Sequence, residues 1–130
     1  MFTNYSSTAP SLIENIGQPI AGRTTKVINF NIHKLTDEEL TALAAESNDT
    51  SVDDFQTTHA FSYSSVEIKP FAFNYATIVS AIINARYPRD EMDAIINNHL
   101  FDPTDKHEAE WQEMQQWRTM AKRIAHECTD

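Results

Sequence analysis

Residues Asn74–Tyr87 read NYATIVSAIINARY, and they open the most strongly periodic part of the chain. Their large apolar side chains recur at steps of three and four residues, which is the spacing of one helix face. Asn74 is a suitable N-cap, because its side-chain oxygen can accept from the free N–H groups of the first turn. Pro88 has no N–H and restricts Tyr87, so this helix is expected to end there.

A second helix is predicted to follow at once, with Pro88 as its first residue, where a missing N–H costs nothing. Asp90 and Glu91 would then lie where the helix dipole favours negative charge. The apolar side chains that this helix is expected to bury are Met92, Ile95, Ile96 and Leu100. So tight a connection is compatible with a sharply kinked pair or a helical hairpin, and we favour two helices.

A third helix is predicted from Pro103 to about Cys128, with Asp102 as its N-cap. Its apolar stripe consists of Trp111, Met114, Trp117, Ala121, Ile124 and Cys128. The favoured interpretation of the stripe is core packing against the other two helices. The alternative is a partly exposed interface at Trp111 and Trp117, since each indole N–H needs a partner. Together the three helices form a predicted C-terminal module over residues 74–130.

Residues 1–23 are rich in serine, threonine and asparagine, and they hold both glycines of the chain. Their only apolar cluster is short and consists of Leu12, Ile13 and Ile16. This composition predicts a flexible N-terminal arm that becomes ordered against a neighbouring protein. With Trp111 and Trp117, these three residues are the candidate protein-interface residues.

Residues 24–73 are predicted to form a small strand–helix–strand region. In Lys26–His33 apolar and polar residues alternate, which indicates a strand with Ile28, Phe30 and Ile32 on one face. Thr36 and Glu39 have capping-box spacing and predict a short helix that ends near Glu46.

The acidic link Ser47–Thr58 follows this helix and is interpreted as a solvated loop. A footprint for a basic partner or a divalent-cation site is the alternative, although the link lacks the residue pattern of a calcium loop.

A second strand is predicted over Ala60–Lys69. Its apolar parity changes between Tyr63 and Val66, so a bulge or tight turn is expected near Ser64–Ser65. The expected product is a sheet of two or three strands between residues 25 and 70. The predicted fold class is therefore α+β, with one globular domain over residues 24–130.

The composition and charge of the chain argue against several classes of function. The net charge is −9, which argues against nucleic-acid binding, because a phosphate backbone calls for a concentrated basic surface. No apolar run is long enough to span a bilayer, and residues 1–10 do not have the pattern of a signal peptide. The single cysteine, Cys128, permits no intrachain disulfide.

The sequence contains no recognisable catalytic, metal-binding or phosphate-binding motif. The five histidines lack the four-residue spacing of a helical zinc pair, and two glycines in the first 22 residues cannot build a glycine-rich phosphate loop. We expect no catalytic residue, no metal ligand and no cofactor. The sequence is interpreted as that of a non-enzyme.

The C-terminal half contains the stretches FNYATIVSAII (residues 73–83), RYPRDEMDAIINN (residues 86–98), EMQQWR (residues 113–118) and AKRIA (residues 121–125). In these stretches the chain resembles small proteins encoded by tailed phages of gut bacteria, the crAss-like phages and their relatives. The resemblance implies a virion component or assembly factor of the tail, neck, fibre or capsid, made in the host cytoplasm. Its partners would be other virion proteins, with several copies in one assembly.

Two other functions stay open at this stage. An acidic phage-encoded inhibitor could occupy the nucleic-acid site of a host protein by mimicking phosphates, provided that its carboxylates form one continuous face. An enzyme subunit with a carboxylate site is the third hypothesis, because residues that converge only in three dimensions leave no local pattern. The first choice is a structural or adaptor protein that acts through protein–protein contacts and forms a homo-oligomer or a multi-copy assembly.

Overall fold

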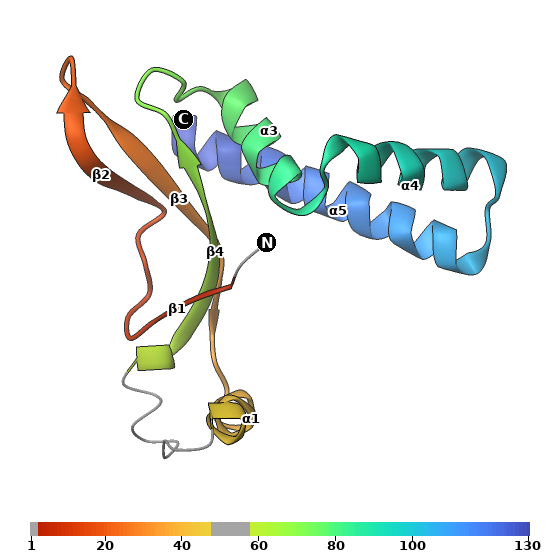
Figure 1. Ribbon diagram of the computed structural model, residues 1–130, viewed down its shortest axis with the longest axis horizontal. Coiled ribbons are helices and arrows are strands. Elements are labelled where there is room, and N and C mark those ends of the chain that lie inside the picture. The colour runs from red at the N-terminus through yellow and green to blue at the C-terminus, as the bar shows by residue number, and fades with distance from the viewer. Residues whose placement is uncertain (1–2, 48–57) are drawn as a thin grey trace. The chain divides into compact units, whose positions relative to one another are not determined.

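The computed structural model describes residues 3–47 and 58–130, and it has a mixed α+β fold (Figure 1). A four-stranded antiparallel sheet has the order β1 (Asn4–Ser6), β4 (Phe61–Ile68), β3 (Arg23–Lys34) and β2 (Ile13–Ile20). Three helices follow in the C-terminal half. The predicted α+β class, with its C-terminal helical module, is confirmed.

Two of the strands lie in the segment that the composition predicts to be a flexible arm. β1 pairs with β4 in the register Asn4↔Tyr63, and β2 joins β3 through the two residues Ala21 and Gly22. Both turn residues have positive φ, 49° and 78°, which is the backbone of the two-residue turns that match strand twist. The segment is therefore part of the sheet, which has four strands instead of two or three.

The alternation predicted for β3 holds only in part. Ile28 and Phe30 are buried, whereas Ile32 is 41% exposed. Asn31 between them has φ of 52°, a left-handed conformation that asparagine tolerates better than most residues. This residue breaks the two-residue period, so Ile32 does not continue the buried face.

Of the two alternatives predicted near Ser64–Ser65, the tight turn is wrong, because β4 continues as one strand from Phe61 to Ile68. The bulge stays a prediction, since a bulge can lie within a continuous strand. Ser64 is buried, although it is a small polar residue.

The chain divides into two compact units, and each is described by itself. The first comprises Met1–Asn15 and Val27–Ser65, and the second comprises Ile16–Lys26 and Val66–Asp130. This division cuts across the predicted segments 1–23, 24–73 and 74–130. It does so because the β2–β3 turn groups with the helices.

In the first unit, α1 (Asp37–Ser47) begins with the predicted capping box. The Thr36 N–H donates to Glu39 Oε1 at 3.0 Å, and the Glu39 N–H donates to Thr36 Oγ1 at 3.2 Å. Leu35 and Leu40 on either side of the cap are both buried. Residues 48–57 of the predicted acidic link (47–58) lie outside the part of the chain that the structure describes.

In the second unit, α3 (Tyr75–Arg86) and α4 (Arg89–Phe101) each pack against the long helix α5 (Asp105–Thr129), as Figure 1 shows. Asn74 is the N-cap of α3, since its Oδ1 accepts from the Thr77 N–H at 2.9 Å. The core of this unit consists of Ile68, Ile78, Ile82, Tyr87, Met114, Trp117, Ala121, Ile124 and Ala125.

Two helix starts differ from the prediction. Pro88 is the N-cap of α4 and not its first residue. Thr104, not Asp102, caps α5, with Thr104 Oγ1 accepting from the His107 N–H at 3.2 Å. Asp102 ends α4 instead, because its N–H donates to the Asn98 carbonyl at 3.0 Å and the following Pro103 disfavours a helical backbone there.

The burial predicted for α4 is wrong as well. None of its residues is fully buried: Met92, Ile95 and Ile96 are half-buried, and Leu100 is 61% exposed. α4 packs substantially only against α5, so its apolar side chains are covered on one side alone.

Candidate functional site

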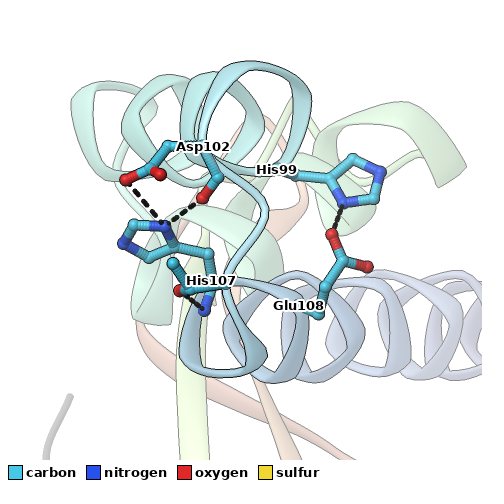
Figure 2. A network of polar contacts seen from close by, with 5 residues as sticks. His99, Asp102, His107 and Glu108 are labelled. Carbon is cyan, nitrogen blue, oxygen red and sulfur yellow. Dashed lines mark hydrogen bonds and ion pairs between the residues drawn. The ribbon is translucent and has the colours of Figure 1, made fainter.

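The turn between α4 and α5 holds an ordered group of polar side chains (Figure 2). The His99 ring on α4 stacks on the Trp111 ring of α5, with centroids 4.2 Å apart and planes 3° from parallel. His99 Nδ1 also donates to Glu108 Oε1 at 2.6 Å. These contacts join the last turn of α4 to the first turns of α5.

A second histidine fixes the turn itself. His107 Nδ1 donates to the Asp102 carbonyl oxygen at 2.6 Å, and Asp102 Oδ2 lies 3.7 Å from the same nitrogen (Figure 2). The Thr104 N–H donates to the Asp102 carbonyl as well, at 2.9 Å. The backbone between the two helices is therefore held from both sides.

These histidines act as braces in this arrangement, because each uses its Nδ1 atom in a hydrogen bond within the turn. In residues 3–47 and 58–130, no three histidine, cysteine or carboxylate side chains converge in a way that would hold a metal ion. The group can position the turn, and its stacked and hydrogen-bonded rings reduce the conformational freedom of the adjacent residues.

The last turn of α4, directly before the braced turn, presents two apolar side chains to solvent. Leu100 is 61% exposed and Phe101 is 82% exposed. We call this pair the apolar tip. Around it in the sequence stand the carboxylates of Asp102, Asp105 and Glu108. Exposed large apolar side chains scattered singly are ordinary, but two adjacent ones beside a rigid turn are a candidate contact site.

Two aromatic rings in the segment before α3 of the same unit each lie near a cation, one ring being exposed and the other half-buried. Arg23 Cζ lies 5.5 Å from the centroid of the Phe71 ring, and Lys26 Nζ lies 5.4 Å from that of Phe73. Phe71 is nonetheless 60% exposed. We call the residues of these two pairs, Arg23, Lys26, Phe71 and Phe73, the cationic patch.

The predicted interface residues are divided between the two units. Leu12 and Ile13 are half-buried in the first unit, while Ile16 is exposed in the second. Trp111 is half-buried beneath His99. Trp117 is only 7% exposed, which agrees with core packing and removes it from any surface.

Trp117 is held in the core by its indole N–H. Its Nε1 donates to the Ile82 carbonyl of α3 at 2.9 Å, and the Tyr87 ring meets it edge-on with centroids 6.5 Å apart. Arg86 covers the same ring at 5.1 Å and forms an ion pair with Glu113 at 3.6 Å. The hydrogen-bond acceptor for this indole N–H is thus a backbone carbonyl, which the sequence alone did not predict.

The titratable groups with displaced pKa values lie outside the α4–α5 turn. Burial raises the pKa of the Cys128 thiol, which favours its protonated form. Burial also raises the pKa of Tyr87. The hydrogen bond from His33, followed by that from the Thr36 N–H, lowers the pKa of Glu39.

An open hollow of about 450 Å³ lies on α5 and is lined by Gln112, Gln115, Gln116, Thr119, Met120 and Arg123. These residues offer amides, one hydroxyl, one thioether and one guanidinium. No carboxylate or histidine lines the hollow beside the Thr119 hydroxyl.

The sequence prediction missed both the apolar tip and the cationic patch. Leu100 continues the helical stripe of α4 and was therefore predicted to be buried. The sequence signal that could have predicted the apolar tip is the pair of bulky apolar residues directly before Asp102–Pro103, where α4 ends. For the patch, no local signal joins Arg23 to Phe71, because the two are far apart in the sequence.

No protein family, curated protein or solved structure matches this chain. Among the helices that the structure describes, none combines the length and the apolar character needed to cross a bilayer.

Proposed function

We propose that this chain is a non-enzymatic structural or adaptor protein of a tailed-phage virion and that it acts through protein–protein contacts. The resemblance of its C-terminal half to small proteins of crAss-like phages suggests the setting. The observation that carries the contact function is the apolar tip, two adjacent apolar side chains exposed directly before a braced turn.

The tip has the energetics of a small contact site. Burying a leucine or phenylalanine side chain completely is worth roughly 1.5–3 kcal/mol each. Interfaces draw most of their binding energy from a few such residues near the centre of the contact. Phe101, at 82% exposed, has nearly all of that energy still available.

The braces make this energy easier to use. Ordering a mobile loop on binding costs free energy that is subtracted from the affinity. The His99–Glu108 and His107–Asp102 hydrogen bonds already restrict the turn in the free protein. A partner would therefore meet a largely preorganised tip.

Mass spectrometry of phage particles purified on density gradients tests this function. We expect the chain to accompany the particles at a fixed ratio to the known virion proteins. Particles from a phage that carries Phe101→Ser should contain less of it, whereas Ile32→Ser, an exposed apolar change in the first unit, should leave the ratio unchanged. A chain detected only in the lysate and never in particles contradicts the proposal.

An acidic inhibitor of a host protein is the second candidate. The net charge of −9 favours it, as does the first turn of α1, which carries Asp37, Glu38 and Glu39. Binding that weakens steeply with added salt would support the inhibitor, because carboxylates that mimic phosphates bind through screened charges. Binding that depends on Phe101 and changes little with salt would support the adaptor.

A further inference from the structure

We infer that two copies of the chain associate through the solvent-facing side of α5, with the two helices antiparallel. The contact lies wholly within α5, which belongs to the second unit. It goes beyond the proposed function, because it names a second copy as the partner and does not use the apolar tip. Its biological setting rests on that function, whereas the contact itself is tested on the purified protein.

The two long sides of α5 differ in composition. One side is buried in the core of the unit and consists of Met114, Trp117, Ala121, Ile124 and Ala125. Five other residues recur at steps of three and four and therefore share one helix face, namely Glu108, Gln112, Gln116, Thr119 and Arg123. All but Glu108 are exposed and line the hollow of about 450 Å³. We call these five residues the outer face of α5.

The charges of α5 are divided along its length. Before Trp117 the helix carries four carboxylates and one lysine, and after Trp117 it carries three cations and one carboxylate. A second α5 in the same direction would place like charges side by side. An antiparallel second α5 places the acidic half of each helix beside the basic half of the other. Charge complementarity therefore favours a second copy in the antiparallel direction.

An antiparallel pair that is centred between Gln115 and Gln116 matches the outer face to itself. In this register Gln112 of each copy lies opposite Thr119 of the other. A glutamine amide both donates and accepts hydrogen bonds, and so does a threonine hydroxyl. The polar side chains at the middle of the outer face can thus find partners in the second copy.

The same register places Glu108 of each copy opposite Arg123 of the other. Arg123 Nη1 donates to Glu127 Oε1 at 3.0 Å, but a guanidinium has five N–H donors, so others remain for a second carboxylate. Glu108 Oε1 accepts from His99 Nδ1 at 2.6 Å, and its second oxygen remains for the guanidinium. The two-fold symmetry of the pair makes this contact occur twice.

This contact is isologous, so it closes at a dimer. The outer face from Glu108 to Arg123 is roughly 23 Å long at 1.5 Å per residue. So short and polar a seam should bury well below the ~800 Å² per partner of a stable complex. We therefore expect weak association that depends strongly on concentration.

The net charge of −9 makes two copies repel each other at long range. At an ionic strength of about 0.15 M, charges more than about 8 Å apart are largely screened, whereas ion pairs in contact are screened less. The association is therefore measured at this ionic strength.

A charge-exchange experiment tests the antiparallel contact. The acidic-half variant carries Asp105→Lys and Glu108→Lys, and the basic-half variant carries Lys122→Glu and Arg123→Glu. Each variant alone brings like charges together at both ends of the seam. In an equimolar mixture of the two, a pair of different copies again has opposite charges at both ends.

Two controls leave the outer face intact. Lys34→Glu with Arg89→Glu gives the chain the same net charge as the basic-half variant has. Phe101→Ser removes the larger side chain of the apolar tip. Both controls should associate like wild type, because neither changes a residue of α5.

Sedimentation velocity over a range of concentrations up to millimolar gives the readout. Wild type and both controls should approach a dimer at the highest concentrations. Each charge variant alone should have a dimer Kd larger by about tenfold or more, because repulsion replaces attraction at two symmetry-related places. The equimolar mixture should regain the dimer.

Disulfide trapping replaces this comparison if a charge variant loses its native circular dichroism spectrum. One chain carries Cys128→Ala and Gln112→Cys, and the other carries Cys128→Ala and Thr119→Cys. After oxidation of the mixture, we expect the disulfide that joins position 112 of one copy to position 119 of the other. In the antiparallel register two copies of position 112 lie about 10 Å apart along the helix axis, so their disulfide should be rarer.

Wild type that stays monomeric throughout overturns the inference and leaves the outer face to a different protein. A mixture that does not regain the dimer overturns it too, as does trapping chiefly between two copies of position 112. A dimer that Phe101→Ser abolishes and the charge variants retain assigns the association to the apolar tip instead. The particle measurement judges the proposed function separately, so a chain present in virions but monomeric here contradicts only the α5 contact.

Discussion

Trp117 connects α3 to α5 through one side chain. Its ring lies in the core at 7% exposure, and its Nε1 donates to the Ile82 carbonyl. The stripe of apolar residues on α5 predicts that this tryptophan is a core residue. The same stripe includes Trp111, which lies half-buried under His99.

Replacing Trp117 should therefore cost more stability than replacing Trp111. We expect Trp117→Ala to lower the free energy of unfolding by about 3–5 kcal/mol, the usual range for a buried tryptophan. Trp117→Phe should lose a smaller amount, on the order of 1–3 kcal/mol, since it removes the indole donor and keeps most of the ring. Urea denaturation measures both, with Trp111→Phe as the control. A Trp111 variant that loses as much as the matching Trp117 variant would contradict this assignment.

Glu39 gives a prediction about pH. Its pKa lies below the ordinary value of 4.5, chiefly because of the hydrogen bond from His33 and then that from the Thr36 N–H. A carboxyl whose folded pKa is lowered contributes stability above its unfolded pKa and loses it as the pH falls through the folded pKa. The stabilising effect of Glu39 should thus be present above pH 4.5 and disappear in stronger acid.

Thermal unfolding of wild type and Glu39→Gln across this range measures the effect. The difference in midpoint should shrink as the solution becomes more acidic than pH 4.5. Glu38→Gln, in the same helical turn but outside the capping box, should show a smaller dependence. A difference between wild type and Glu39→Gln that stays constant with pH would contradict the contribution of the ionised carboxylate.

At the scale of elements, local signals gave correct predictions where one chain segment satisfies its own backbone. The Thr36–Glu39 capping box and the Asn74 N-cap are both present, because each bond spans only three residues. The start of α5 differs, since Asp102 and Thr104 are both good caps on either side of Pro103. The stop of α4 at Asp102 leaves Thr104 to cap α5.

This competition between two caps can be measured directly. Thr104→Ala removes the side-chain oxygen that accepts from the His107 N–H, and we expect it to lower the free energy of unfolding by about 1 kcal/mol. Asp102→Ala should cost less, because the Asp102 side chain makes only a 3.7 Å contact with His107. If urea denaturation gives equal losses of unfolding free energy, or a larger loss for Asp102→Ala, then Asp102 is the N-cap of α5, as predicted from the sequence.

The strands were less predictable than the helices for a physical reason. β2 contains Gly17 and Pro19, which are both uncommon inside strands, and its turn consists of Ala21 and Gly22 in place of the usual Asn-Gly pair. Its backbone hydrogen bonds are made with the partner strand β3. Pairing between strands stabilises β2, and a pattern read from the sequence of one segment does not predict that pairing.

At the scale of the whole molecule, the surfaces that matter most arise from tertiary structure. Leu100 belongs to an apolar stripe and was predicted to be buried, yet α4 packs substantially only against α5 and leaves it exposed. The cationic patch joins Arg23 and Lys26 to Phe71 and Phe73 across more than forty residues of sequence. Neither surface has a periodic or motif-like signature.

The central claim is that the exposed Phe101 contacts another protein of the particle, and photo-cross-linking tests it most directly. Phage particles are prepared with Phe101→benzoylphenylalanine, irradiated and digested for mass spectrometry, with Ile32→benzoylphenylalanine as the control. The account predicts cross-links from position 101 to a virion protein and none from position 32. Particles that contain the chain but yield no cross-link from position 101 would contradict it.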